Sequence, residues 1–270
     1  MLIDFHTHIF PDRIAQRTLE VLKAGSLKCE KKEAISYFDG TKSGLLSLMA
    51  DCGIDISIAL PIATKPTQTD SINAFAASAT DKNIISFATL HPQNEDTDKI
   101  LENIKESGFK GIKLHPEFQE IYVDSPEIIN ILKKAEELEL YTVFHTGHDI
   151  GLPPPVHSMP IRFKHILEYI SGEFIIAAHL GGWRAWDDVE KYLVGTPIRF
   201  DTAFIKNFIP HEQAKRIIKN HGSEKILFGS DAPWENPKDT LEFLLSLELS
   251  EKEIENITYK NAEKILKRDV

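Results

Sequence analysis

Short apolar runs alternate with longer amphipathic stretches along the whole chain. Eight of the runs are predicted strands, because most are rich in β-branched or aromatic residues and are apolar on both faces. That composition is typical of parallel strands whose sheet is covered by helices. The predicted strands are residues 2–8, 56–62, 84–91, 111–115, 141–145, 174–179, 198–203 and 226–230.

The stretches between the strands have the apolar spacing of helices that bury one face. The spacing is clearest at residues 96–107 and 126–138, and Ser125 is a suitable N-cap for the second of these helices. Two further helices are predicted at residues 241–247 and 254–266. Strands that alternate with helices in this way are joined by crossovers and run parallel.

Eight strand–helix units favour a closed (β/α)8 barrel, the TIM barrel, over an open doubly wound sheet. No GxGxxG motif follows a predicted strand, which also argues against a dinucleotide-binding sheet. Such a barrel needs about 250 residues, so we expect a single domain over residues 1–270. Two long loops are predicted, at residues 25–42 and 151–160, and loops that follow strands form the substrate pockets of barrel enzymes.

Composition narrows the range of partners. The formal charge is 31 − 41 = −10, and an acidic surface repels phosphate backbones, so we expect no nucleic-acid partner. No apolar run approaches the ~20 residues of a membrane span, and no signal peptide is evident, so we expect no membrane partner. Cys29 and Cys52 are too few for a disulfide framework, which favours the reducing cytoplasm. We therefore expect a cytoplasmic protein that acts on a small molecule, and we leave homo-oligomerisation open.

The histidines gather at the predicted strand ends. Six of the 11 lie at or near C-terminal ends of strands, which converge on one mouth in a barrel. Imidazole is the commonest metal-binding side chain, so the pattern predicts a metal site at that mouth. His145 and His179 each end a strand in a loop of small residues, and the alternative for either is a core histidine bonded to a backbone carbonyl. The six residues are His6, His8, His91, His115, His145 and His179.

The motif at residues 4–8, Asp-Phe-His-Thr-His, is the sharpest signal. Residues i and i+2 of a strand point to the same face, so His6 and His8 should project together while Phe5 faces the helices. Asp231 follows the last strand, which neighbours the first in a closed barrel. It could supply an anionic ligand and accept a proton, and its alternative is a turn or N-cap aspartate before the next helix.

Lys113 lies inside an apolar strand, where burying an ammonium is costly. One interpretation is that carbon dioxide adds to the neutral amine and gives a carbamate that bridges two metal ions. The other is an ion pair with a barrel acid such as Asp231 or Glu117, and the sequence leaves both open. His115 shares the face of Lys113 and is a candidate ligand or substrate contact.

Together these residues resemble the amidohydrolase superfamily, and especially its aminocarboxymuconate-semialdehyde decarboxylase-like members. The motif at residues 4–8, Lys-Leu-His-Pro at 113–116, His145, Ala-His-Leu-Gly-Gly at 178–182 and Gly-Ser-Asp-Ala-Pro at 229–233 fall in the order and strand positions of that superfamily. The resemblance covers essentially the whole chain and implies a distorted (β/α)8 barrel. We expect no added β-sandwich, because the first strand begins at Leu2.

The resemblance also implies a site for divalent metal, with zinc expected as one or two ions, bound by His6, His8, His145 and Asp231. It implies that His179 is either a ligand of a second ion or a catalytic residue near the first. Lys113 is similar in its setting to the carbamylated lysine of dihydroorotases. Many relatives in the decarboxylase-like group work with one metal, which weighs against a bridging role.

The leading expectation is a metal-dependent hydrolase that activates water to cleave an amide, lactone or ester bond in a small molecule. In that mechanism Asp231 accepts the proton of the water and returns it to the leaving group, while His179 stabilises the oxyanion. The alternative is a metal-dependent decarboxylase, a lyase that acts on an aromatic or unsaturated carboxylic acid. A third interpretation, from another class, is a non-catalytic metal-binding barrel, against which the full ligand set argues.

Several residues after predicted strands are candidate substrate contacts. Arg184 would suit a carboxylate or phosphate of the substrate, and its alternative is a solvent-facing arginine at the start of a helix. The candidates are Phe10, His115, His148, Trp183, Arg184 and Trp234.

Overall fold

The computed structural model, which describes residues 1–266, contains parallel strands that alternate with helices in the predicted order. The strands form two hydrogen-bonded sheets, of order β1-β2-β3 and β4-β5-β6-β7-β8-β9. The bounds are β1 (Ile3–Thr7), β2 (Ile56–Ala59), β3 (Ile84–Ser86), β4 (Ala88–Thr89), β5 (Gly111–Leu114), β6 (Tyr141–Phe144), β7 (Ile175–Ala177), β8 (Arg199–Asp201) and β9 (Ile226–Leu227).

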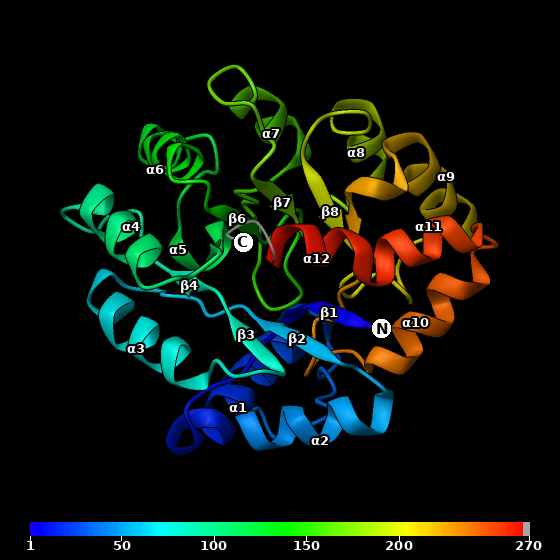
Figure 1. Cartoon of the computed structure of the whole chain (residues 1–270), viewed down its shortest axis with the longest axis horizontal. Coiled ribbons are helices and arrows are strands. Elements are labelled where there is room, and N and C mark those ends of the chain that lie inside the picture. The colour runs from blue at the N-terminus through cyan, green and yellow to red at the C-terminus, as the bar shows by residue number, and fades with distance from the viewer. Residues whose placement is uncertain (267–270) are drawn as a thin grey trace.

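Backbone hydrogen bonds join the two sheets into a closed barrel. β3 and β4 are two halves of one predicted strand, interrupted at Phe87, whose N–H donates to the Ala59 carbonyl across 2.9 Å. The segment after β9 meets β1 through the Asp231 N–H, which donates to the His6 carbonyl across 2.8 Å. The predicted (β/α)8 barrel is therefore confirmed, with interruptions that distort it (Figure 1).

Helices surround the barrel (Figure 1). The two clearest predictions are confirmed as α4 (Thr97–Glu106) and α6 (Pro126–Glu137), and the Ser125 side chain accepts from the Ile128 N–H as an N-cap. No helix within residues 1–266 is long and apolar enough to cross a membrane. The other helices are α1 (Asp12–Glu30), α2 (Lys42–Cys52), α3 (Thr69–Ala79), α5 (Pro116–Gln119), α7 (Pro160–Ile166), α8 (Trp186–Tyr192), α9 (His211–His221), α10 (Pro237–Ser246), α11 (Glu251–Glu255) and α12 (Asn261–Leu266), with 3-10 turns η1 (Pro66–Gln68) and η2 (Ser223–Lys225) and the π-helical η3 (Asn256–Lys260).

An apolar cluster fills the interior of the barrel below the mouth. Phe5 and Phe87 meet there edge to face, with ring centroids 5.6 Å apart, and two apolar residues of α12 close the N-terminal end. The prediction that Phe5 faces the helices is wrong. The register with β2 shifts between Asp4 and Thr7, and such a bulge breaks the two-residue alternation of side chains. Because apolar residues seal this end, the polar groups of the interior lie toward the opposite end.

Residues 9–41, which we call the β1–α2 insertion, connect β1 to α2 and contact loops that follow other strands. Within α1, Gly25 packs against the loop after β6, and a Cβ at this position would lie 3.2 Å from the Gly151 carbonyl oxygen. At the end of α1, Glu30 forms a two-pronged ion pair with Arg184 after β7, with N–O distances of 2.7 and 3.0 Å. The insertion therefore bridges loops that follow two different strands.

The end of the insertion contacts the segment after β9, where the Tyr37 N–H donates to the Pro233 carbonyl across 2.8 Å. The loop predicted at residues 25–42 is wrong in its first part, because α1 continues to Glu30 and ends at a left-handed Lys31. The loop predicted at residues 151–160 is confirmed, and Pro160 begins α7.

Candidate metal centre

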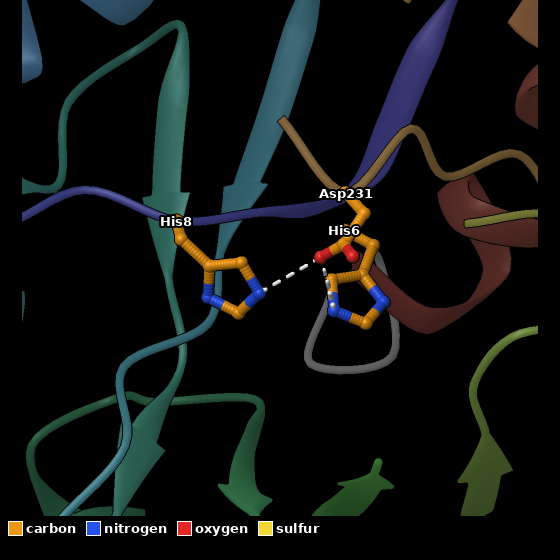
Figure 2. Close-up of side chains that lie close together, drawn as sticks. All are labelled: His6, His8 and Asp231. Carbon is orange, nitrogen blue, oxygen red and sulfur yellow. Dashed lines mark hydrogen bonds and ion pairs between the residues drawn. The ribbon is translucent and has the colours of Figure 1, made fainter. Parts of the chain in front are cut away.

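Three predicted ligands converge at the mouth, where β1 and the segment after β9 lie side by side (Figure 2). The Nε2 atoms of His8 and His6 lie 3.0 and 3.4 Å from Oδ1 of Asp231. The alternative role of Asp231 as a helix N-cap is wrong, because Asn236 caps α10. Burial alone would raise the pKa of Asp231, but the neighbouring histidines lower it to about 2, so the carboxylate is ionised.

Hydrogen-bond acceptors fix the tautomers of the two histidines. Nδ1 of His6 lies 2.8 Å from Oδ2 of Asp201, and Nδ1 of His8 lies 2.9 Å from the Leu60 carbonyl oxygen. A carboxylate and a carbonyl can only accept, so each Nδ1 carries the proton and each Nε2 presents a lone pair toward Asp231. The three ligand atoms lie within 4.8 Å of one another. Two neutral imidazoles and one carboxylate are a donor set that fits zinc or another divalent transition metal.

A second pair of histidines, after β6 and β7, continues the site, and the rings of His6 and His179 have centroids 5.4 Å apart. His179 Nδ1 donates to the Ala203 carbonyl, and His145 Nε2 donates to the His148 carbonyl, both across 2.9 Å. The remaining nitrogens, His179 Nε2 and His145 Nδ1, face each other at 3.0 Å without a proton. Two lone pairs at that distance need a cation beside them. Burial lowers the pKa of both rings to about 4, so both rings are neutral and their unprotonated nitrogens can each accept a proton or bind a metal ion.

Lys113 lies on the floor of this cluster, with Nζ 3.4 Å from Nε2 of His6. Burial lowers the pKa of Lys113 to about 8, although Asp231 partly offsets the effect. The alternative of an ion pair with Glu117 is wrong, because that carboxylate accepts from the ring of His157 and its neighbours instead. The side chain of Lys113 is only 1% exposed, so its amine is shielded from bulk water.

His115 lies beside the cluster with both ring nitrogens engaged. Nδ1 accepts from the Phe118 N–H at 3.3 Å, so Nε2 carries the proton and lies 3.4 Å from Oδ2 of Asp149. The ring stacks on His145, with centroids 4.3 Å apart. Although His115, His145 and Asp149 have the composition of a metal site, the nitrogens that face the carboxylate carry protons. We interpret this group as a support that orients His145.

The remaining candidate substrate contacts differ in their surroundings. Arg184 pairs with Glu30 and lies over the Trp183 ring, 4.2 Å from its centroid. Its side chain is exposed just before α8, which agrees with the alternative of a solvent-facing arginine at a helix start. Trp183 is 2% exposed, and its Nε1–H donates to the Phe204 carbonyl across 3.1 Å, so it packs as part of the protein interior. The candidates that are half-buried on loops after β1, β6 and β9 are Phe10, His148 and Trp234.

Two buried acids that organise the site were missed in the sequence. Asp201 ends β8 and binds His6, and its signal was a charged residue within the apolar run 198–203. Glu117, at the start of α5, accepts from the Ser158 hydroxyl at 2.8 Å and from His157 Nδ1 at 2.6 Å, which fixes the end of the loop after β6. Glu117 had been considered only as a partner for Lys113.

The sequence and the fold are both similar to those of known proteins. Residues 3–268 match the family described as amidohydrolase, whereas curated proteins gave no match. Three solved structures share the fold: 5-carboxyvanillate decarboxylase from Sphingomonas paucimobilis (15% identity, 98% of each chain covered, TM-score 0.67); 2,6-dihydroxybenzoate decarboxylase from Rhizobium (16% identity, 100% of this chain and 99% of that chain, TM-score 0.66); and dihydroxybenzoic acid decarboxylase from Polaromonas sp. JS666 with bound manganese and the inhibitor 2-nitroresorcinol (16% identity, 100% and 97%, TM-score 0.68).

These relatives correct the leading expectation of a hydrolase for amide, lactone or ester bonds. The solved structures similar to this chain are mostly decarboxylases, so the hydrolase interpretation is contradicted and the decarboxylase alternative is better supported. At identities of 15–16%, the similar structures establish only a common fold. The family match establishes membership, because it spans nearly all of the sequence and includes its motifs. The resemblance that those motifs indicated is confirmed, and the chain belongs to the amidohydrolase family.

Proposed function

We propose that this protein is a metal-dependent decarboxylase, a lyase that removes carbon dioxide from an aromatic or unsaturated carboxylic acid. The observation that carries the proposal is the buried Lys113, whose Nζ lies 3.4 Å from His6 among the candidate metal ligands. A carboxylate that enters so dry a site needs a cation in place of its lost water. The shared fold of the decarboxylases named above supports the same conclusion.

We assign one divalent ion to His6, His8, His145 and Asp231. Zinc is the ion we expect, and the manganese of the Polaromonas enzyme makes Mn²⁺ the second ion to test. When bound, the ion supplies a Lewis acid that orients the substrate and stabilises negative charge on it. We assign His179 to catalysis rather than to a second ion.

His179 is the proposed proton donor. Its Nδ1 is held by the Ala203 carbonyl, so Nε2 is the atom that takes up and releases a proton. In the reaction the bond between the substrate carbon and its carboxyl group breaks, the electron pair stays on that carbon, and carbon dioxide leaves. His179 Nε2, which carries no proton at rest, takes up a proton from solvent and delivers it to that carbon in place of the carboxyl group. Asp231, ionised and directed into the same space, is the proposed base that accepts a proton from solvent and passes it to His179.

The second prediction for Lys113, carbamylation, competes with this proposal. A lowered pKa leaves part of the amine neutral and reactive toward carbon dioxide, the product of the proposed reaction. A carbamate is an anion, however, and would remove the cation that we assign to the substrate carboxylate. The mass of the intact protein separates the two, because the proposal requires an unmodified lysine in the active enzyme.

The decisive experiment measures carbon dioxide release. Protein loaded with Zn²⁺ or Mn²⁺ is incubated with benzoic acids that differ in hydroxyl substitution and with unsaturated aliphatic acids. We expect release from at least one acid, and we expect Lys113→Met to lose it while the circular dichroism spectrum is kept. The matched control is Lys82→Met, which changes an exposed lysine. No release from any acid, or full activity in Lys113→Met, would contradict the proposal.

We also propose that the substrate is a small molecule and that the protein is a single barrel domain in the cytoplasm. We infer no nucleic-acid or membrane partner, and the formal charge of −10 supports the first of these statements. Light scattering after size exclusion would give the oligomeric state.

A further inference from the structure

Asp201 is a fully buried carboxylate that links two sides of the candidate metal centre. Its Oδ2 lies 2.8 Å from Nδ1 of His6, a residue 195 positions away in the sequence. Its Oδ1 accepts the backbone N–H of His179 at 2.8 Å and that of Ala203 at 3.0 Å. One carboxylate therefore holds the ring of a candidate ligand and the backbone of the candidate proton donor.

The two carboxylate oxygens of Asp201 have different hydrogen-bond partners and different roles. The Oδ1 side accepts two backbone N–H groups that would otherwise be buried without partners, which is a structural role. The Oδ2 side accepts from a ring that has two tautomers, so it decides which nitrogen of His6 carries the proton. With the proton on Nδ1, the Nε2 lone pair of His6 is directed toward Asp231 and Lys113, and it accepts from the Lys113 amine in the absence of metal.

We propose that Asp201 is a positioning residue that fixes the tautomer of His6 and so prepares its Nε2 to bind metal. The proposal rests on the metal centre proposed above, since a tautomer matters only if His6 is a ligand. A proton on Nε2 would occupy the lone pair that the ion needs. Within residues 1–266, His6 Nδ1 has no other hydrogen-bond partner that would oppose that change.

The variant Asp201→Asn separates this role from the structural one. An amide has one accepting oxygen and one donating nitrogen, so it cannot accept on both sides. If the amide oxygen faces the backbone N–H groups of His179 and Ala203, it accepts from both. In the reverse orientation the amide NH₂ would face these two N–H groups, and three donors would meet without an acceptor. The first orientation places the amide NH₂ against Nδ1 of His6. His6 must then accept at Nδ1 and carry its proton on Nε2.

The test uses metal-free protein labelled with ¹⁵N-histidine, in which NMR distinguishes protonated from unprotonated ring nitrogens. In the native protein we expect His6 to have a protonated Nδ1 and a bare Nε2. In Asp201→Asn we expect the opposite tautomer, with Zn²⁺ affinity, measured by calorimetry, lowered by about 10–100-fold. The matched control is Glu235→Gln, another buried acid near the mouth that has no hydrogen bond to a histidine, and it should keep the native tautomer.

The outcomes distinguish this inference from the proposed function. A protonated Nε2 on His6 in the native protein, or an unchanged tautomer in a folded Asp201→Asn, would overturn the role of Asp201. If the variant does not fold, the tautomer in the native protein still decides the matter. Native protein with the expected tautomer but without Zn²⁺ or Mn²⁺ binding would refute the metal centre and leave the tautomer assignment standing.

Discussion

Glu235 allows a quantitative test of how burial controls charge near the mouth. It lies on the loop after β9, is 5% exposed, and has an Oε2 atom with no hydrogen-bond partner in the described residues. Burial raises the pKa of Glu235 from 4.5 to about 8. Lys206 partly offsets this effect, but its ammonium is already paired with Asp239 at 2.9 Å. Replacing Glu235 with glutamine removes the titration while nearly keeping the shape.

The sign and size of the effect follow from the two pKa values. The folded protein keeps a proton on Glu235 up to about pH 8, whereas the unfolded chain loses it near pH 4.5. Between these values the folded state binds more protons, so the free energy of unfolding falls as the pH rises. Each pKa unit corresponds to about 1.4 kcal/mol, which gives a loss of up to about 3 kcal/mol between pH 5 and pH 8. The unfolding free energy of Glu235→Gln should not show this loss, because glutamine does not titrate.

The assay is urea unfolding of metal-free native protein and Glu235→Gln, followed by fluorescence at several pH values from 5 to 8. The quantity of interest is the difference in unfolding free energy between the two proteins, because buried histidines titrate in both and cancel. We expect this difference to grow by about 3 kcal/mol in favour of the variant as the pH rises. Glu168→Gln, at an exposed position, should show no such trend. A difference constant to within about 0.5 kcal/mol would refute the reasoning.

The remaining predictions concern the site and its supports. His6→Ala and Asp231→Asn should each lose Zn²⁺ binding in calorimetry while circular dichroism shows an intact barrel, and full occupancy in both would contradict the ligand assignment. Gly147→Ala should lower the unfolding free energy by about 2–4 kcal/mol, because its φ is +86° and the new Cβ would lie 2.4 Å from the Trp183 carbonyl oxygen; an unchanged urea midpoint would argue against this. Lys113→Ala should lose decarboxylation and regain part of it with small primary amines, whereas recovery with small carboxylic acids would favour the carbamate.

The barrel could be predicted because each of its strands needs a short run of apolar residues, which is visible in the local sequence. A parallel strand buried on both faces must be apolar throughout, and eight such runs appear at the expected intervals. The errors are also local. The bulge after Asp4 turned Phe5 inward, against the two-residue alternation. Gly25 and Ser26 have low helix propensity, yet α1 continues through them because Gly25 provides the close backbone approach to Gly151.

The site could be predicted in part for a similar reason. The spacing of His6 and His8 and the place of Asp231 after the last strand are visible in one sequence. The partners that orient these residues are not, because hydrogen bonds such as that between His6 and Asp201 join distant positions and depend on the exact rotation of each ring. Arg184 shows the same limit, since its partner Glu30 belongs to a helix end that the local pattern assigned to a loop.

The β1–α2 insertion contributes no strand to the cylinder, yet it contacts the loops that follow β6, β7 and β9. The candidate metal ligands and the segment that contacts these loops thus lie in separate stretches of the polypeptide. Because the segment takes no part in strand pairing, replacing it would leave the pairing that positions the candidate ligands unchanged. Diversification within such a scaffold can proceed by exchanging one segment, without redesigning the reaction itself.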